Sequence, residues 1–89
     1  MAHCMLVRHR VRDFSVWKSG YDAHLSKRRE AGLSEVHLLR GAHDANEVFL
    51  LFRAEDLNRA KAFTESADLR ETMGRLGVLD RPDISFLND

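Results

Sequence analysis

Apolar residues follow two different spacings along this chain, and each spacing predicts its own kind of element. Residues 3–11 and 47–53 carry apolar side chains at both odd and even positions, as in Cys4-Met5-Leu6-Val7 and Val48-Phe49-Leu50-Leu51-Phe52. Strands that are covered on both faces show such unbroken apolar runs. We therefore predict two central strands, one over residues 3–11 and the other over residues 47–53.

A helical spacing follows the first of these strands. Its apolar stripe consists of Phe14, Trp17, Tyr21 and Leu25, and it continues to Arg28. One amphipathic helix over residues 14–31 is predicted, with Asp13 as its N-cap and Gly32 at its left-handed stop. The cations Lys27-Arg28-Arg29 fall in the last turn, where positive charge complements the helix dipole.

A second helical stretch runs from Asp56 to about residue 76, and Asp68 with Glu71 resembles a capping box inside it. The pattern is compatible with two short helices or with one bent helix. Strands are also predicted over residues 34–40 and 83–87, and the mixed polarity of the first of them suits a sheet edge. Pro82, the only proline, precedes the last of them, where it removes no ladder hydrogen bond.

The predicted order is βαββαβ, an α+β fold with a ferredoxin-like antiparallel sheet and two helical segments on one face, built as a single domain over residues 1–89. The first and third strands are central in this topology, in agreement with their unbroken apolar runs. The sheet face without helices would expose one parity of an apolar set, a patch of roughly several hundred Å². That set comprises Met5, Val7, Leu38, Leu50, Phe49, Leu51, Ile84 and Phe86. We therefore expect a homodimer formed by sheet-to-sheet packing.

Composition narrows the classes of function. The 14 basic residues balance the 14 acidic ones, which argues against a nucleic-acid partner, and the 44% hydrophobic content argues against disorder. A solitary Cys4 excludes an intramolecular disulfide and suits a reducing, cytoplasmic compartment. No apolar run is long enough for a membrane span. The spacing of His, Cys, Asp and Glu matches no metal site, and neither a nucleophile elbow nor a phosphate loop is present.

The stretch Val7-Arg8-His9-Arg10-Val11-Arg12-Asp13-Phe14-Ser15-Val16-Trp17-Lys18 resembles the opening of small proteins of the dimeric α+β barrel superfamily, and most of all the antibiotic biosynthesis monooxygenase-like proteins. The stretches 40–48 and 77–87 fit the same pattern. The resemblance implies a dimeric α+β barrel and a small aromatic or polyketide-like ligand, with no cofactor. The haem-degrading members carry an axial histidine on the second helix. Residues 56–76 contain neither His nor Trp, so no haem is expected.

Five side chains are candidates for chemistry. His9 shares its parity with Met5 and Val7, so its imidazole should face a covered side of the sheet and act there as a general base. Its alternative role is a structural histidine bonded to a backbone carbonyl. Tyr21 is a second catalytic candidate. Trp17, His24 and His37 are candidates for substrate binding. Trp17 and Tyr21 could instead be core residues, and His37 could face either layer.

Two functions remain open. One is a small-molecule enzyme for cofactor-independent oxygenation, cyclisation or isomerisation, with His9 as base and Tyr21 and Trp17 as walls. The other is a non-catalytic, ligand-binding or structural homodimer. An enclosed volume that touches His9 and Tyr21 would favour an enzyme or a binder. A space filled by Trp17, Phe63 and Met73 would favour a structural role.

Overall fold

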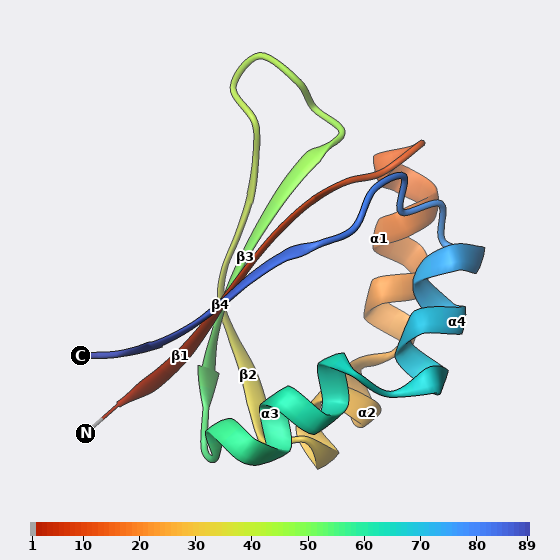
Figure 1. Ribbon diagram of the computed structural model, residues 1–89. Helices are drawn as coiled ribbons and strands as arrows, with labels where there is room; N and C mark the ends of the chain where they lie inside the picture. Colours follow the sequence, from red (N-terminus) through yellow and green to blue (C-terminus); the bar gives the residue numbers. More distant parts are fainter. Residues whose placement is uncertain (1) are drawn as a thin grey trace.

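The computed structural model describes residues 2–89 and contains one sheet with all its helices on one side (Figure 1). The elements in chain order are β1 (His3–Arg10), α1 (Phe14–Ala23), α2 (Leu25–Glu30), β2 (Leu33–Arg40), β3 (Glu47–Ala54), α3 (Leu57–Thr64), α4 (Ala67–Arg75) and β4 (Asp83–Asn88). This is the expected α+β, ferredoxin-like order, with each helical segment divided in two.

The four strands form one antiparallel sheet in the order β2-β3-β1-β4. The two strands with unbroken apolar runs are therefore central, and the two mixed strands are edges, as predicted. Residues that face each other across β1 and β3, such as Val7 and Leu50, point to the same side of the sheet. The register between β2 and β3 shifts near Val36, a β-bulge on the edge strand.

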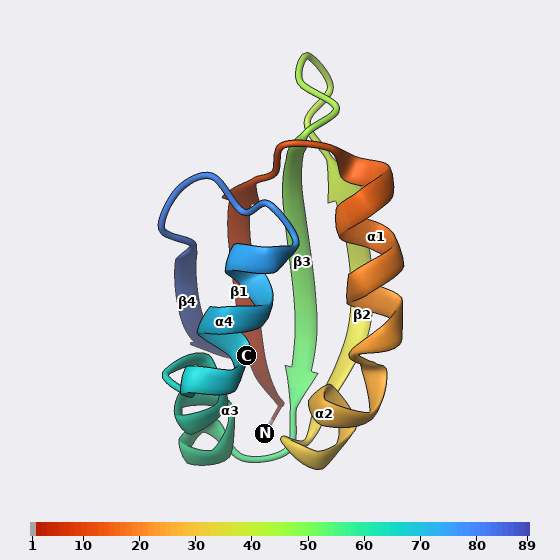
Figure 2. The same ribbon diagram turned by 90° about the vertical axis from the view of Figure 1, so that its right-hand side faces the viewer.

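The helices cover the face that carries the odd-numbered residues of β1. Figure 2 shows α1 and α2 over the β2 side of the sheet and α3 and α4 over the β1 and β4 side. The core lies between these layers. Its buried members include Met5, Val7, Val48, Leu50 and Phe52 from the sheet and Trp17, Tyr21 and Ala60 from the helices.

The single helix expected over residues 14–31 is wrong in one respect, because it breaks at His24. Asp13 caps the start as predicted, with its carboxylate accepting from the N–H groups of Ser15 and Val16. At the break, the carbonyl of Tyr21 accepts the N–H of His24 and also a guanidinium N–H of Arg28, at 2.6 Å. This side chain competes for a carbonyl that would otherwise continue the helical ladder.

The second helical stretch forms two helices, α3 and α4. Asp56 caps α3 by accepting from the N–H groups of Asn58 and Arg59. The capping box expected from Asp68 and Glu71 is wrong, because Ser66 is the N-cap of α4 and accepts from the N–H of Leu69. Asp68 lies instead in the first turn of α4, where a negative charge suits the helix dipole.

The face without helices carries only part of the apolar set expected there. Ile84 and Phe86 lie opposite Val7 and Met5, so both point to the helical side. The open face instead carries Cys4, Leu6, Leu39, Phe49, Leu51 and Leu87. Arg8 lies among them and forms ion pairs with Glu47 at 2.7 Å and Asp83 at 3.4 Å, which neutralise much of its charge.

Candidate functional site

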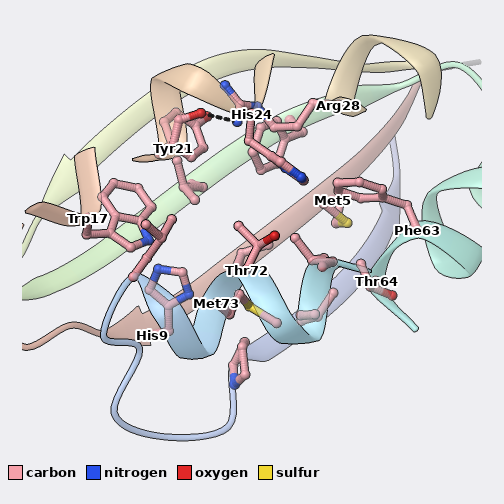
Figure 3. A pocket seen from close by; sticks show the side chains of 17 residues that line it. Met5, His9, Trp17, Tyr21, His24, Arg28, Phe63, Thr64, Thr72 and Met73 are labelled. Atoms are coloured by element: carbon pink, nitrogen blue, oxygen red, sulfur yellow. Dashed lines mark hydrogen bonds between the residues drawn. The ribbon is translucent and has the colours of Figure 1, made fainter. Parts of the chain in front are cut away.

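A cavity of about 80 Å³ lies between the helical layer and the centre of the sheet (Figure 3). Its floor comes from β1, β3 and β4, and its walls come from all four helices. The lining is mostly apolar, but five polar side chains reach it, namely His9, His24, Arg28, Thr64 and Thr72. Trp17, Phe63 and Met73 line this space and do not fill it, so a partly open cavity that touches both His9 and Tyr21 is present.

His9 is the most unusual group in the cavity. Its residue is only 4% exposed, and it faces the helices from β1, as its parity predicts. Neither Nδ1 nor Nε2 has a hydrogen-bond partner among residues 2–89, which rules out the backbone-bonded alternative for this chain. Burial lowers the pKa of His9, and the charge of Asp80 opposes this shift only in part. The ring is thus a neutral, unpaired imidazole at pH 7, with one nitrogen free to accept and the other free to donate.

Aromatic rings extend from His9 along the wall made by α1. The rings of His9 and Trp17 contact each other edge to face, with their centroids 5.5 Å apart. Trp17 in turn stacks on Tyr21, with centroids 4.7 Å apart and planes 20° from parallel. The spacing of four residues along α1 places both rings on the sheet-facing side. Trp17 and Tyr21 therefore belong to the core and also line the cavity.

The hydroxyl of Tyr21 is engaged outside the row of rings. It donates a hydrogen bond of 2.8 Å to Oε1 of Glu35 on the edge strand. Burial, followed by this hydrogen bond, raises the pKa of the Tyr21 phenol far above its usual value. Tyr21 therefore contributes its ring to the cavity wall, and the catalytic role expected for its hydroxyl requires the bond to Glu35 to open.

Arg28 completes the row and was missed as a site residue. The sequence places it among three cations of a last helical turn, yet its residue is only 7% exposed and lines the cavity. Its guanidinium lies 3.6 Å from the centroid of the Tyr21 ring, a cation–π contact. The available signal was its position on the apolar stripe, seven residues after Tyr21, whereas Lys27 and Arg29 point to solvent.

Of the two remaining histidine candidates, only His24 lines the cavity. His24 lies at the helix break, lines the cavity, and places Nε2 3.3 Å from a carboxylate oxygen of Asp68. His37 lies opposite Leu51 on the open face of the sheet and is exposed. His37 therefore does not line this cavity, because the bulge near Val36 turns its side chain to the open face.

A wider groove of about 570 Å³ adjoins the cavity. Thr64, Met73, Pro82 and Ile84 line both spaces. The groove carries more charged residues than the cavity, and they include Arg70, Asp80 and Arg81. The groove is thus the approach to the cavity, between the helical pair α3–α4 and the segment before β4.

The described residues contain neither a cluster of metal ligands nor a membrane-spanning helix. Residues 2–89 hold no group of three or more His, Cys, Asp or Glu side chains that is arranged for a metal ion. Within the same residues, no helix is long and apolar enough to cross a membrane. The site is a mostly apolar pocket with two imidazoles, a guanidinium and aromatic walls.

Comparison with solved structures finds the same fold in monooxygenase-like proteins. A proposed antibiotic biosynthesis monooxygenase from Bordetella bronchiseptica is similar over 100% of this chain and 98% of its own, with a TM-score of 0.79 and 16% identity. The cofactor-independent oxygenase SnoaB from Streptomyces nogalater is similar over 99% of this chain and 92% of its own (TM-score 0.73, 12% identity). The ActVA-Orf6 monooxygenase of Streptomyces coelicolor, bound to nanaomycin D, covers 99% and 87% (TM-score 0.69, 17% identity).

No family model and no curated protein matches the sequence. The likeness in structure extends over almost the whole of each chain, so the chain has the ferredoxin-like fold of antibiotic biosynthesis monooxygenase proteins. This confirms the fold expected from the resemblance. At these identities the likeness carries no residue role from one protein to another.

Proposed function

We propose that this protein is a small-molecule enzyme of the antibiotic biosynthesis monooxygenase type, which oxygenates an aromatic, polyketide-like compound without a cofactor. The observation that carries the proposal is the imidazole of His9, buried with both nitrogens unpaired and lining a cavity. An unsatisfied polar group of this kind costs stability, and such costs gather at functional sites. The fold shared with SnoaB, a cofactor-independent oxygenase, supports the same proposal.

The chemistry needs one base and one oxidant. Neutral His9 accepts a proton from a methylene that a neighbouring ketone and aromatic rings make acidic. The resulting carbanion reduces dioxygen, and the methylene becomes a carbonyl. One oxygen atom of O₂ enters the product, and the other leaves as water with the two hydrogens of the methylene. The mostly apolar cavity favours this step, because a ligand bound there would displace the water that would otherwise stabilise and reprotonate the anion.

The test uses 1,8-dihydroxyanthrone, which has such a methylene, in buffer treated with a chelator. Oxygen uptake and product formation are measured for the wild type, for His9→Phe, and for the control His43→Phe, whose site is exposed in the hairpin loop. We expect turnover above the spontaneous rate in the wild type and control. A loss of at least 100-fold is expected in His9→Phe, the low end of the contribution of a general base. Equal turnover by His9→Phe would remove His9 from the mechanism.

A second function has its own supporting observation. The hydroxyl of Tyr21 is held by Glu35, so no second acid or base pairs with His9 among the described residues. A cavity in which the one unpaired imidazole has no such partner also suits a binding protein that holds an aromatic ligand without changing it. Saturable binding of the anthrone with no oxygen uptake above background would favour this binder over the enzyme.

We also propose that two copies pack their open sheet faces together. Leu6, Leu39 and Leu87 on that face are 37%, 58% and 43% exposed, and Phe49 and Leu51 lie between them. The charge of Arg8 is already paired, so burying this face would strand no cation. Cys4 lies on the same face, and we place the dimer in the cytoplasm, where this thiol stays reduced.

A further inference from the structure

The guanidinium of Arg28 is a buried cation without a counter-ion. Among residues 2–89 it forms no ion pair, and its one hydrogen bond runs from Nη1 to the carbonyl of Tyr21 at 2.6 Å. The carboxylates of Glu35 and Asp22 attract it without touching it. Glu35 instead accepts the Tyr21 hydroxyl. The charge is therefore only partly compensated by this chain.

Most of the hydrogen-bonding capacity of Arg28 is also unused. A guanidinium has five N–H donors in a rigid, planar fork. Nε and Nη2 donate to no group in the described part of the chain, and the side chain lines the cavity. Among the described residues, only the nitrogens of His9 are both fully buried and unpartnered, so the free donors of Arg28 stay within reach of a ligand that enters the cavity. An anion with two oxygens in one plane fits such a fork best.

The row of planar groups indicates the rest of the ligand. His9, Trp17, Tyr21 and Arg28 follow one another along one wall, with contacts of 5.5, 4.7 and 3.6 Å between successive centres. A flat aromatic skeleton can lie along this wall. Arg28 is at one end of the row and the base His9 is at the other, which separates the group that binds from the group that reacts.

We propose, building on the function proposed above, that the ligand is a flat aromatic carboxylic acid whose carboxylate binds the fork of Arg28. A phosphate fits less well, because its extra charge would need more donors than the mostly apolar lining provides. Arg28 thus sets specificity for an acid and fixes which end of the ligand reaches His9.

Size sets how such a ligand enters. A cavity of about 150 Å³ is known to hold benzene, so the 80 Å³ cavity must extend to take a fused ring. The adjoining groove supplies the volume, and Met73 lies between the two spaces as a shared lining residue. Methionine has three rotatable side-chain bonds, which let it move aside without disturbing the backbone.

The test compares 2-naphthoate with 2-naphthamide, which has nearly the same shape but no charge at pH 7. Affinity is measured by titration calorimetry on the full chain. We expect naphthoate to bind at least tenfold more tightly than the amide. In Arg28→Met this preference should disappear while the affinity for the amide stays the same. The control Arg29→Met removes the neighbouring, exposed charge and should keep the preference. Arg28→Lys keeps the charge without the fork and should retain only part of it.

Each remaining outcome decides between the proposals. Equal affinity of the wild type for acid and amide would refute the role of Arg28 and leave the aromatic pocket standing. A preference that survives in Arg28→Met would place the anion elsewhere and refute the inference too. Failure of both compounds to bind would overturn the pocket itself and, with it, the proposed function. If Arg28→Met does not fold, the wild-type ratio and the Arg28→Lys variant still decide.

Discussion

Replacing His9 by phenylalanine should make this protein more stable while it destroys the site. The imidazole holds one donor and one acceptor that are buried without partners. Each such group costs about 1–3 kcal/mol in the folded state. Phenylalanine has neither group, and it keeps an aromatic ring against Trp17, whose edge contact with His9 is worth about 0.5–1.5 kcal/mol.

Phenylalanine is slightly larger than histidine, and overpacking a core can cost about 1–3 kcal/mol. Here the adjoining cavity of about 80 Å³ can take the additional carbon, so this cost should be small. We therefore expect a net stabilisation of about 1–3 kcal/mol. For a domain of this size, each kcal/mol raises the Tm by about 4–8 °C.

The assay is urea unfolding at pH 8, where histidine is neutral in both the folded and the unfolded chain. Protein concentration is held fixed, because an assembling protein gains apparent stability with concentration. The control His43→Phe should change the free energy of unfolding by less than about 0.5 kcal/mol. A destabilised His9→Phe with an unchanged slope would show that the imidazole is satisfied in the native protein, and the reasoning would fail.

Three further outcomes follow from the same contacts. Because burial lowers the pKa of His9, the unfolded chain takes up a proton near pH 6.5 that the native chain resists. Wild-type stability should therefore fall as the pH drops below about 6.5, and by more than that of His9→Phe in parallel urea titrations; equal losses would contradict the burial. Gly20→Ala should lose about 1–3 kcal/mol in thermal unfolding, since a Cβ there would lie 2.7 Å from Cδ1 of Leu76. Gly74→Ala, which has open space, should gain about 0.5–1 kcal/mol, and the same sign for both would refute the close approach. In sedimentation, the wild type should be a dimer at micromolar concentration and Leu51→Glu a monomer; a monomeric wild type would end the dimer proposal.

The strand pattern predicted the sheet well because burial on both faces leaves a direct mark on composition. The runs around Met5 and Leu50 could belong only to central strands, and topology agreed with them. The face of the sheet to which His37 points could not be predicted from this pattern. A single bulge at Val36 changes which side chains of the edge strand point to each face of the sheet. The residue types in that strand do not predict a bulge.

The candidate site could also be predicted only in part, because local patterns report some of its residues and not others. Parity placed His9 correctly, and helical spacing placed Trp17 and Tyr21 against the sheet. Arg28 was misread because a charge near a helix end has an ordinary explanation in the helix dipole. Its burial depends on the tertiary contact with the carbonyl of Tyr21 that also breaks the helix, and local patterns do not report such contacts.

The position of Trp17 between His9 and Tyr21 gives the protein an optical reporter of its own. Trp17 is the only tryptophan in the chain, so all indole emission originates in the cavity wall. A positive charge on the adjacent imidazole would quench that emission, and a ligand lying along the wall would shift its wavelength. Proton uptake and ligand entry can therefore be followed on the unmodified chain, without a dye or a label.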